Sequence, residues 1–362
     1  MVKAPLRVYA PRDFIEAKAV SPNKVRIIAA MFPGPRESAI SWATKHEKAA
    51  LDFRDRLLKS GINLVDQKDR PQHLGENDFC LNNCLPFSEQ TALVKVYAPE
   101  VQAPNTVDYY TFEANPFFPV VAKEPGLDEG SGIFFIETSE QWGKFKSFIE
   151  NVTPFYKKIF VFQEYILTPS ERFTSFRVMV DATGSVLASS LIYSGHEKST
   201  EETDRVDIPF SELEQLGANL LDQLRHPASP YYLAARKMFS NCAQGGGLIT
   251  LNPRKLTTSP QNKMENGLLT AHGIDPVTRK LPPVLSAAAS TLGRTLVKEQ
   301  ALYAGLDFVP EAETGRHLFM ESNPTCGLLT YAAAKSLREA DYVVQKETVL
   351  DEVLRNLLAH AS

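Results

Sequence analysis

The chain has 362 residues, of which 43% are hydrophobic, enough for the cores of two or three domains. Its formal net charge is −4, and neither lysine nor arginine gathers into a basic run, which argues against nucleic-acid and membrane-surface partners. No window approaches the roughly 20 apolar residues that span a bilayer, and the first residues lack the apolar run of a signal peptide. We therefore expect a soluble, cytoplasmic protein.

The cysteine content points to reduced thiols with structural roles. The four cysteines are Cys80, Cys84, Cys242 and Cys326. They are too few for a disulfide framework in a chain of this size, and Cys80 and Cys84 have no second pair at the spacing of a zinc site.

The first third of the chain, residues 1–104, predicts a small α/β domain. An apolar run at 24–30 predicts a buried strand, and the helix that follows places Ala50, Phe53 and Leu57 on one face. Gly61 ends that helix, and a second strand begins at Ile62. The order strand, helix, strand favours a parallel pair joined by a right-handed crossover.

The middle of the chain, residues 105–168, predicts a smaller α+β unit. Short apolar runs at 119–123, 132–136 and 158–166 predict strands around one helix. That helix begins at Thr138, where Thr138 and Gln141 have the spacing of a capping box.

The last part, residues 169–362, predicts a second α+β unit built on two hairpins. One has strands at 176–180 and 185–193, and the other has strands at 306–309 and 318–322. Residues 241–282 show little periodicity, which is typical of a solvated insertion or of a loop that closes over a site.

Lys123 ends an apolar strand and precedes a glycine-rich segment that contains Gly126, Gly130 and Gly132. A lysine beside unshielded backbone N–H groups suits a polyphosphate. The spacing is neither that of a P-loop nor that of a dinucleotide-binding turn, because the lysine comes before the glycines. A surface turn with a lysine that extends into water fits the same pattern.

A set of oxygen-bearing side chains near the C-terminal hairpin indicates a metal site. Glu321 and Asn323 are two residues apart and leave the same face of one strand, and Asp307 lies on the expected partner strand. Hard oxygen ligands without histidine or cysteine are what Mg²⁺ prefers. A charged outer face is the alternative. Under either interpretation the alternation predicts a core on the opposite face, made of Leu306, Phe308, Leu318 and Met320.

Between about residues 95 and 327 these motifs, in this order, resemble the ATP-grasp superfamily. The stretch PVVAKEPGLDEGSGI is similar to its lysine strand and glycine loop, VFQEYI to its adenine hinge, and GLDFV with FMESNPTCG to its magnesium-binding end. The resemblance implies a fold of mixed α/β and α+β type. An α/β N-terminal domain would precede a mobile central lid and a C-terminal α+β domain, with ATP between the last two.

The resemblance also implies site residues. Lys123 matches the lid lysine that contacts ATP phosphates, Lys95 an earlier nucleotide-binding lysine, Glu164 a reader of the adenine amine and Glu171 a ribose contact. The implied nucleotide site consists of Lys95, Lys123, Gly126, Gly130, Ser131, Gly132, Gln163, Glu164, Tyr165, Ile166 and Glu171. Asp307, Glu321 and Asn323 would bind Mg²⁺, for which Mn²⁺ could substitute.

The sequence departs from the family at one position with a chemical role. Several ligase branches carry an arginine two residues before the magnesium aspartate, where this chain has Gly305. Arg294, Lys198 or Lys298 could take that role. Arg177 resembles a strand arginine of several branches that meets phosphate, although a solvent-facing arginine is the alternative.

The function implied is an ATP- and Mg²⁺-dependent ligase that joins a carboxylate to an amine or thiol through an acyl phosphate, releasing ADP and phosphate. Its partners would be a small carboxylic acid and an amine, and a homodimer is compatible. The sequence contains neither a G-x-S-x-G elbow nor paired cysteine and histidine motifs, so no protein nucleophile is expected. A kinase that phosphorylates a hydroxyl and a regulatory nucleotide-binding module remain alternatives.

Overall fold

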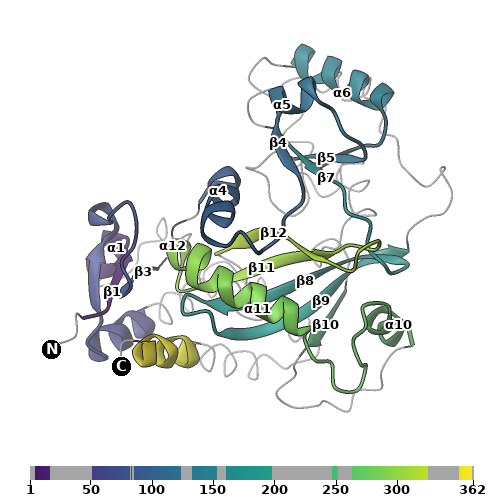
Figure 1. Ribbon diagram of the computed structural model, residues 1–362. Coiled ribbons are helices and arrows are strands. Elements are labelled where there is room, and N and C mark those ends of the chain that lie inside the picture. Colours follow the sequence, from purple (N-terminus) through teal and green to yellow (C-terminus); the bar gives the residue numbers. More distant parts are fainter. Residues whose placement is uncertain are drawn as a thin grey trace, which may run out of the picture.

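The computed structural model of this protein describes residues 5–16, 51–81, 83, 85–123, 133–152, 160–197, 247–251, 263–324 and 350–360. These residues form three sheets, which Figure 1 shows as an N-terminal sheet, a central sheet and a large sheet. The predicted fold class, an α/β N-terminal unit followed by α+β units, is confirmed.

The N-terminal sheet has the strand order β2-β1-β3, and both of its strand pairs are parallel. Its strands are β1 (Arg7–Ala10), β2 (Asn63–Asp66) and β3 (Asp78–Cys80). Phe53 and Leu57 from helical residues 51–59 pack in its core together with Val353 and Leu357 of the C-terminal helix, residues 350–360. Both ends of the described chain therefore stabilise the same unit.

Both observed strand pairs are parallel, but the partner of β2 is β1, which was not predicted as a strand, and the predicted pair with a strand at 24–30 stays a prediction. The helix ends where predicted, because Gly61 adopts a positive φ of 77°, which a residue with a side chain rarely takes. The predicted strand at 24–30 and Ala50 lie outside the described residues.

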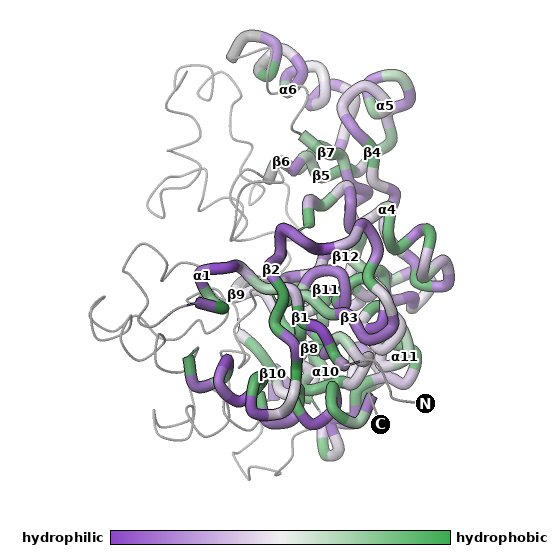
Figure 2. The backbone as a smooth tube through the Cα atoms, turned by 90° about the vertical axis from the view of Figure 1, so that its left-hand side faces the viewer, coloured by the Kyte–Doolittle hydropathy of each residue, from purple (hydrophilic) through white to green (hydrophobic). Residues whose placement is uncertain are grey.

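The central sheet is antiparallel with the order β4-β7-β5-β6. Its strands are β4 (Thr106–Asp108), β5 (Val120–Lys123), β6 (Ile133–Ile136) and β7 (Val161–Glu164). The helices α5 (Tyr109–Ala114) and α6 (Ser139–Val152) cover one side of it. Figure 2 shows hydrophobic residues along β5 and β7, as a sheet buried under helices requires.

The predicted start of α6 is confirmed. The Gln141 N–H donates to Thr138 Oγ1 at 3.2 Å, and Gln141 Oε1 accepts from the N–H of Glu137 at 2.6 Å. These contacts satisfy backbone donors that the first turn of a helix otherwise leaves unpaired.

The large sheet is antiparallel with the order β10-β9-β8-β11-β12. Its strands are β8 (Arg172–Asp181), β9 (Val186–Glu197), β10 (Gly247–Leu251), β11 (Tyr303–Pro310) and β12 (His317–Asn323). One face packs against α11 (Pro283–Leu292) and the π-helical turn η7 (Gly293–Val297), while α4 (Phe87–Tyr97) lies beside β12. Both predicted hairpins, β8–β9 and β11–β12, are confirmed.

The expectation for residues 241–282 is wrong where the structure describes them. This segment contributes β10 and the helix α10 (Lys263–Ala271), and Ile249 and Leu268 of these elements are buried in the core of the large sheet. Five residues are too few to show a strand period beside a glycine run, and β10 gains its hydrogen bonds from β9. Residues 252–262 lie outside the description.

The predicted core face of β12 is also corrected at one residue. Leu306, Phe308 and Leu318 are buried, but Met320 is only partly buried and Phe319 takes its place in the core. A β-bulge causes this change, because the pairing passes from Asp307 with Glu321 directly to Phe308 with Phe319. A bulge inserts one residue and reverses the alternation beyond it.

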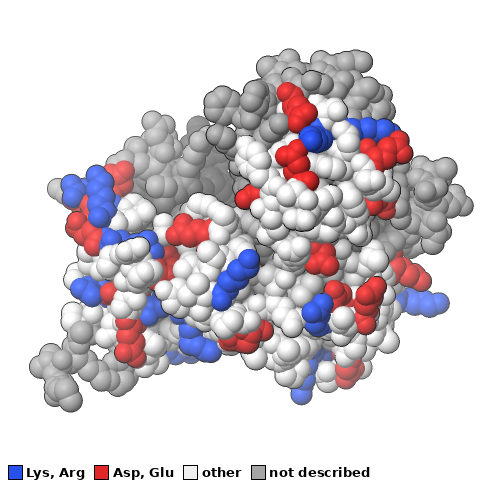
Figure 3. Space-filling view, turned by 45° about the horizontal axis from the view of Figure 1, so that its top comes forward, with Lys and Arg blue, Asp and Glu red and all other residues white. Residues whose placement is uncertain are grey.

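On the face drawn in Figure 3, lysine, arginine, aspartate and glutamate are interspersed among the described residues. Within the same described ranges, every helix is too short or too polar to cross a bilayer. The domain boundaries at 104 and 168 stay predictions; α4, just before the first, packs Val94 and Ala98 into the core of the large sheet.

Candidate active site

The three predicted metal ligands lie together on the face of the large sheet opposite α11. The pairing of β11 with β12 sets Asp307 directly across from Glu321. Asn323 Nδ2 donates to Asp307 Oδ2 at 3.0 Å and to Glu321 Oε1 at 3.2 Å. We call Asp307, Glu321 and Asn323 the carboxylate–amide cluster. The three side chains lie together, but Asn323 turns its amide nitrogen rather than its oxygen toward the two carboxylates, and their role as metal ligands stays a prediction.

Arg177 completes this cluster from the neighbouring strand. The register of β8 against β11 pairs Arg177 with Asp307, and the guanidinium binds the carboxylate in bidentate fashion. Arg177 Nε donates to Oδ1 at 2.7 Å and Nη2 to Oδ2 at 2.6 Å. The side chain is 27% exposed, so the solvent-facing alternative for Arg177 does not hold.

The electrostatics of Asp307 reflect its burial. Asp307 is 8% exposed, and burial raises the pKa of its carboxyl above the ordinary value. The Arg177 guanidinium and the Asn323 amide oppose this rise, whereas the neighbouring Glu321 carboxylate adds to it. Two carboxylates this close are stable only with cationic or hydrogen-bonding groups around them, and the site supplies both.

Lys123 approaches the cluster from the central sheet. It is the last residue of β5, and its Nζ donates to Gln163 Oε1 on β7 at 2.6 Å. Burial lowers the pKa of Lys123, while the Glu321 and Asp307 carboxylates act against this lowering. The two carboxylates of the large sheet are thus near enough to act on the charge of Lys123, which itself is hydrogen-bonded to Gln163 of the central sheet.

The predicted hinge, residues 163–166, includes the last two residues of β7 and the two residues that follow it. Gln163 is 1% exposed, and its Nε2 donates to Thr106 Oγ1 at 3.2 Å, so this amide holds Lys123 in place. Glu164 Oε2 accepts from the N–H of Asn105 at 3.2 Å. Both predicted adenine-facing side chains therefore make contacts within the protein.

The remaining hinge residues are held by the chain around them. The Tyr165 N–H donates to the carbonyl of Pro119 at 3.2 Å, and its ring packs edge-on against Phe135 at 4.6 Å between centroids. Ile166 is buried, and the predicted ribose contact Glu171 is exposed.

Several predicted site residues lie elsewhere. Lys95 is exposed on α4. Arg294 lies on η7 beside the β8–β9 turn, where a Cβ added to Gly184 would come within 2.8 Å of its Nη1. Lys298 donates to the carbonyl of Glu76 at 2.7 Å. The candidates outside the description are Gly126, Gly130, Ser131, Gly132 and Lys198.

The sequence analysis did not assign a role to Gln90, whose amide contacts β12 between two cluster residues. The 232 positions that separate Gln90 from Ser322 explain why no local pattern predicted this contact. In the described part of the chain no group of three histidine, cysteine, aspartate or glutamate residues could hold a metal. The cluster has two carboxylates and one amide, so it falls outside such a group.

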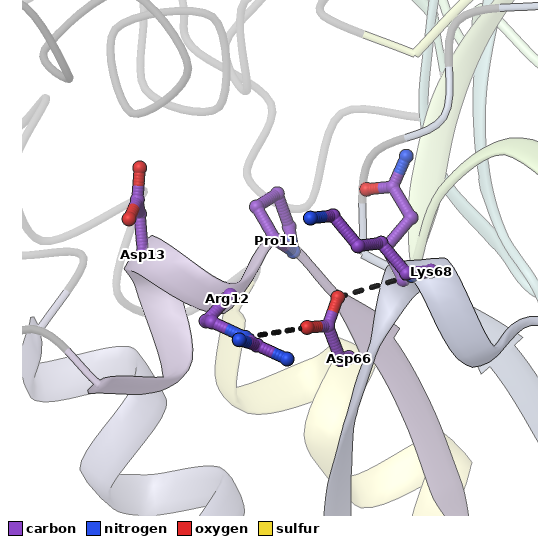
Figure 4. A pocket seen from close by; sticks show the side chains of 6 residues that line it. Pro11, Arg12, Asp13, Asp66 and Lys68 are labelled. Atoms are coloured by element: carbon purple, nitrogen blue, oxygen red, sulfur yellow. Dashed lines mark hydrogen bonds and ion pairs between the residues drawn. The ribbon is translucent and has the colours of Figure 1, made fainter.

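A separate cavity of about 490 Å³ lies in the N-terminal unit, at the carboxyl ends of β1 and β2 (Figure 4). It is lined by Pro11, Arg12, Asp13, Asp66, Gln67 and Lys68. Arg12 Nε donates to Asp66 Oδ2 at 2.7 Å, and the backbone N–H of Lys68 lowers the pKa of Asp66. The carboxyl ends of parallel strands are where α/β sheets bind ligands, yet none of these residues belongs to the predicted site.

Comparison with known proteins gives distant structural similarity. No family model and no curated protein matches the sequence. Among solved structures, the chain is similar to the ATP-grasp ligase PsnB complexed with a minimal precursor, at 9% identity and a TM-score of 0.40, covering 89% of this chain and 74% of that one.

Two further solved structures are similar at the same level. The D-alanine–D-alanine ligase from Bacillus anthracis complexed with ATP has 10% identity and a TM-score of 0.38, covering 97% of this chain and 99% of that one. The biotin carboxylase domain of Hydrogenobacter thermophilus 2-oxoglutarate carboxylase, complexed with MgADP, has 12% identity and a TM-score of 0.36, covering 95% and 69%.

Proposed function

We propose that this protein is an ATP- and Mg²⁺-dependent ligase that joins a carboxylate to an amine or thiol through an acyl phosphate. The observation that carries the proposal is the hydrogen-bonded carboxylate–amide cluster of the large sheet, whose Glu321 and Asp307 carboxylates also act on the charge of Lys123, the last residue of β5. A cation on one side and metal-binding oxygens on the other form a clamp suited to a polyphosphate. The ATP-grasp resemblance predicts this same pairing.

The cluster fits a hard divalent cation. Asp307 and Glu321 supply carboxylate oxygens, and Asn323 would supply Oδ1 after its amide turns away from the two carboxylates it now bridges. When bound, Mg²⁺ or Mn²⁺ neutralises charge on the β- and γ-phosphates. In return, the cation would relieve the repulsion between the two carboxylates.

Two cationic residues of this chain would act on the phosphates directly. Lys123 would bind phosphate oxygens by a charge-assisted hydrogen bond, held in place by Gln163. Arg177 orients Asp307 and would place its guanidinium beside the transferred phosphoryl group. We therefore assign to Arg177 the role for which the family's arginine is missing at Gly305, in preference to Arg294 on η7.

The central sheet would act as the lid. Its aromatic core contains Phe112, Phe145 and Phe162 and is separate from the cores of the other two sheets. A unit with its own core can move as a body about the hinge at 163–166 and exclude water from the acyl phosphate. The adenine ring would have to be read by other groups of the hinge, because the side chains of Gln163 and Glu164 and the N–H groups of Glu164 and Tyr165 are bound within the protein.

Trapping the acyl phosphate tests the proposal. The protein is incubated with ATP, Mg²⁺, hydroxylamine and pooled carboxylic acids, and the products are analysed by mass spectrometry. A ligase forms ADP and a hydroxamate, and Asp307→Asn should form neither.

The second candidate, a kinase, is favoured by Gly305 in place of the ligase arginine. It would convert pooled alcohols to stable phosphate esters instead. Finding the ester without any hydroxamate would select the kinase. Finding neither, with no release of ADP in the presence of any acid, would contradict the ligase.

A further inference from the structure

The strand β12, which carries Glu321 and Asn323, is an edge strand. Among the described residues it is the last strand of the large sheet, and β11 is its one partner strand there. An edge strand leaves every second N–H and C=O pair without a ladder partner. At Ser322, between the two cluster residues, both of these groups are nevertheless hydrogen-bonded.

A single side-chain amide satisfies both groups. The Ser322 N–H donates to Gln90 Oε1 at 3.0 Å, and Gln90 Nε2 donates to the Ser322 carbonyl at 3.3 Å. The amide of Gln90 therefore takes the place of one residue of a neighbouring strand. It does so at the one position of β12 that has a cluster residue on each side.

Gln90 is itself fixed by its surroundings. It is 7% exposed on α4, its Nε2 also donates to the carbonyl of Leu85 at 3.1 Å, and Val94 anchors the helix in the core of the large sheet. Ser322 is held on its side chain too, because its Oγ donates to Gln300 Oε1 at 3.3 Å. The helix α4, which is anchored in the core, thus holds the backbone of β12 at Ser322 through two hydrogen bonds.

The bulge in the β11–β12 ladder explains why the backbone of β12 needs the hydrogen bonds from Gln90. The β11–β12 ladder is irregular between Asp307 and Phe308, immediately beside Glu321. Bulges disrupt the ladder locally and bend the strand, so pairing with β11 fixes this part of β12 less firmly than a regular ladder would. A metal site, in contrast, tolerates deviations of only about 0.2 Å in its ligand distances.

We infer that Gln90 is a positioning residue that sets the spacing of Glu321 and Asn323 for a divalent cation. The inference rests on the proposed function of the carboxylate–amide cluster. Residues that orient metal ligands from behind typically change metal affinity by about 10- to 100-fold when they are replaced. We expect an effect of this size at Gln90, although the residue has no contact with the cation.

The test compares two substitutions at Gln90 with a matched control on the same helix. Gln90→Met keeps the length of the side chain and removes both hydrogen bonds to Ser322 together with the one to Leu85, whereas Gln90→Glu keeps the acceptor for the Ser322 N–H. The control is Thr91→Val, because the Thr91 hydroxyl donates to the carbonyl of Phe87 within α4. For each variant the melting temperature and the affinity for Mn²⁺ are measured, the latter by the electron paramagnetic resonance of free Mn²⁺ in the presence of ADP.

The expected result is an increase of about 10- to 100-fold in the Mn²⁺ dissociation constant for Gln90→Met. Gln90→Glu should show a smaller increase and Thr91→Val none. Wild-type Mn²⁺ affinity in both folded Gln90 variants, or an equal loss in Thr91→Val, would overturn the inference while leaving the proposed function in place. If Gln90→Met does not fold, the Mn²⁺ affinity of Gln90→Glu is compared with that of Thr91→Val, and equal affinities would overturn the inference. Absence of ADP-dependent Mn²⁺ binding in the wild type would instead reject the proposed function, and this inference with it.

Discussion

The central sheet and the large sheet differ in the length of their strands and in the residue types of their cores. The strands of the central sheet are three or four residues long, and their core is built from rings such as Phe112, which stacks on Phe162 at 4.4 Å between centroids. The large sheet has strands of up to 12 residues and a mainly aliphatic core that includes Val178 and Leu306. Aromatic side chains bury more area per residue, so they let a small unit hold together.

The two sheets also differ in how they carry the residues of the candidate site. One face of the large sheet packs in its own core. The other packs in part against the N-terminal unit through Met179 and Tyr303, and strand register also fixes Arg177 against Asp307 and the rest of the cluster. The central sheet contributes one charged group, Lys123, from a strand end. A rigid unit is suited to hold metal ligands, and a small separate unit is suited to deliver a cation and withdraw it.

The largest expected effect is a loss of stability that is confined to the central sheet. Phe112 is fully buried, and Phe112→Ala should lower the free energy of unfolding of this unit by about 3–5 kcal/mol, because it leaves a cavity against Phe162 and Trp142. Hydrogen exchange should accelerate in β4–β7 while β8 and β11 stay protected. Phe176→Ala, in the core of the large sheet, is the control and should expose β8 and β11. Uniform acceleration over both sheets in Phe112→Ala would contradict the independence of the two units.

The next effect concerns the chemistry of the large sheet. Glu321→Gln and Asn323→Ala should each lower turnover by about 100- to 1000-fold, because each removes a preorganised ligand of the proposed metal site. Glu313→Gln, an exposed carboxylate in the turn of the same hairpin, is the control. Rates of hydroxamate formation are measured across a Mg²⁺ titration, together with melting temperatures. Near-normal turnover at ordinary Mg²⁺ concentrations would contradict the metal site and favour the alternative that these residues form a charged, solvent-facing surface.

A smaller effect is expected from the cation of the central sheet. Lys123→Ala should weaken ATP binding by about 10- to 100-fold and leave the fold intact, since a hydrogen bond to a charged group contributes about 1.5–3 kcal/mol. Lys144→Ala, an exposed lysine on α6 of the same unit, should bind ATP as the wild type does. Calorimetric titration gives both affinities, and an unchanged value for Lys123→Ala would remove this residue from the site.

The smallest effect is a pH dependence of the large sheet. Burial lowers the pKa of His317, whose ring packs on Phe176 at 5.2 Å between centroids. The unfolded state therefore binds the proton more readily, so the stability contributed by His317 is complete above its unfolded pKa, about 6.5, and is lost as pH falls below it. Urea unfolding at pH 7.5 and 5.5 should show a smaller loss in His317→Gln than in the wild type. Equal losses would assign the dependence to other groups.

Much of the local structure followed from the sequence. The strands that end in Lys123 and Glu164, the capped start of α6 and the two hairpins have periods and turn residues that act within a few positions. The cluster was predictable for the same reason. Glu321 and Asn323 share a face because they are two apart, and a tight hairpin sets Asp307 on the partner strand.

Local sequence patterns did not predict those elements whose structure depends on a distant partner. The strand β10 was missed because its hydrogen bonds come from β9, and β1 because its partners β2 and β3 lie more than 50 positions away. The exchange of Met320 for Phe319 in the core depended on a bulge, which no alternation pattern reveals. Arg177 could be placed on a strand, but its face and its partner Asp307 became known from the register of β8 against β11.

The sequence by itself determined which residue types could bind a phosphate or a metal, and on which strands they stand, because side-chain chemistry and strand periodicity are local properties. Tertiary structure alone decided that Arg177 binds Asp307, that the Glu321 and Asp307 carboxylates act on the charge of Lys123, and that Gln90 holds Ser322. The two hydrogen-bonded pairs join residues 130 and 232 positions apart. Their geometry depends on how sheets and helices pack, and packing is a property of the whole chain.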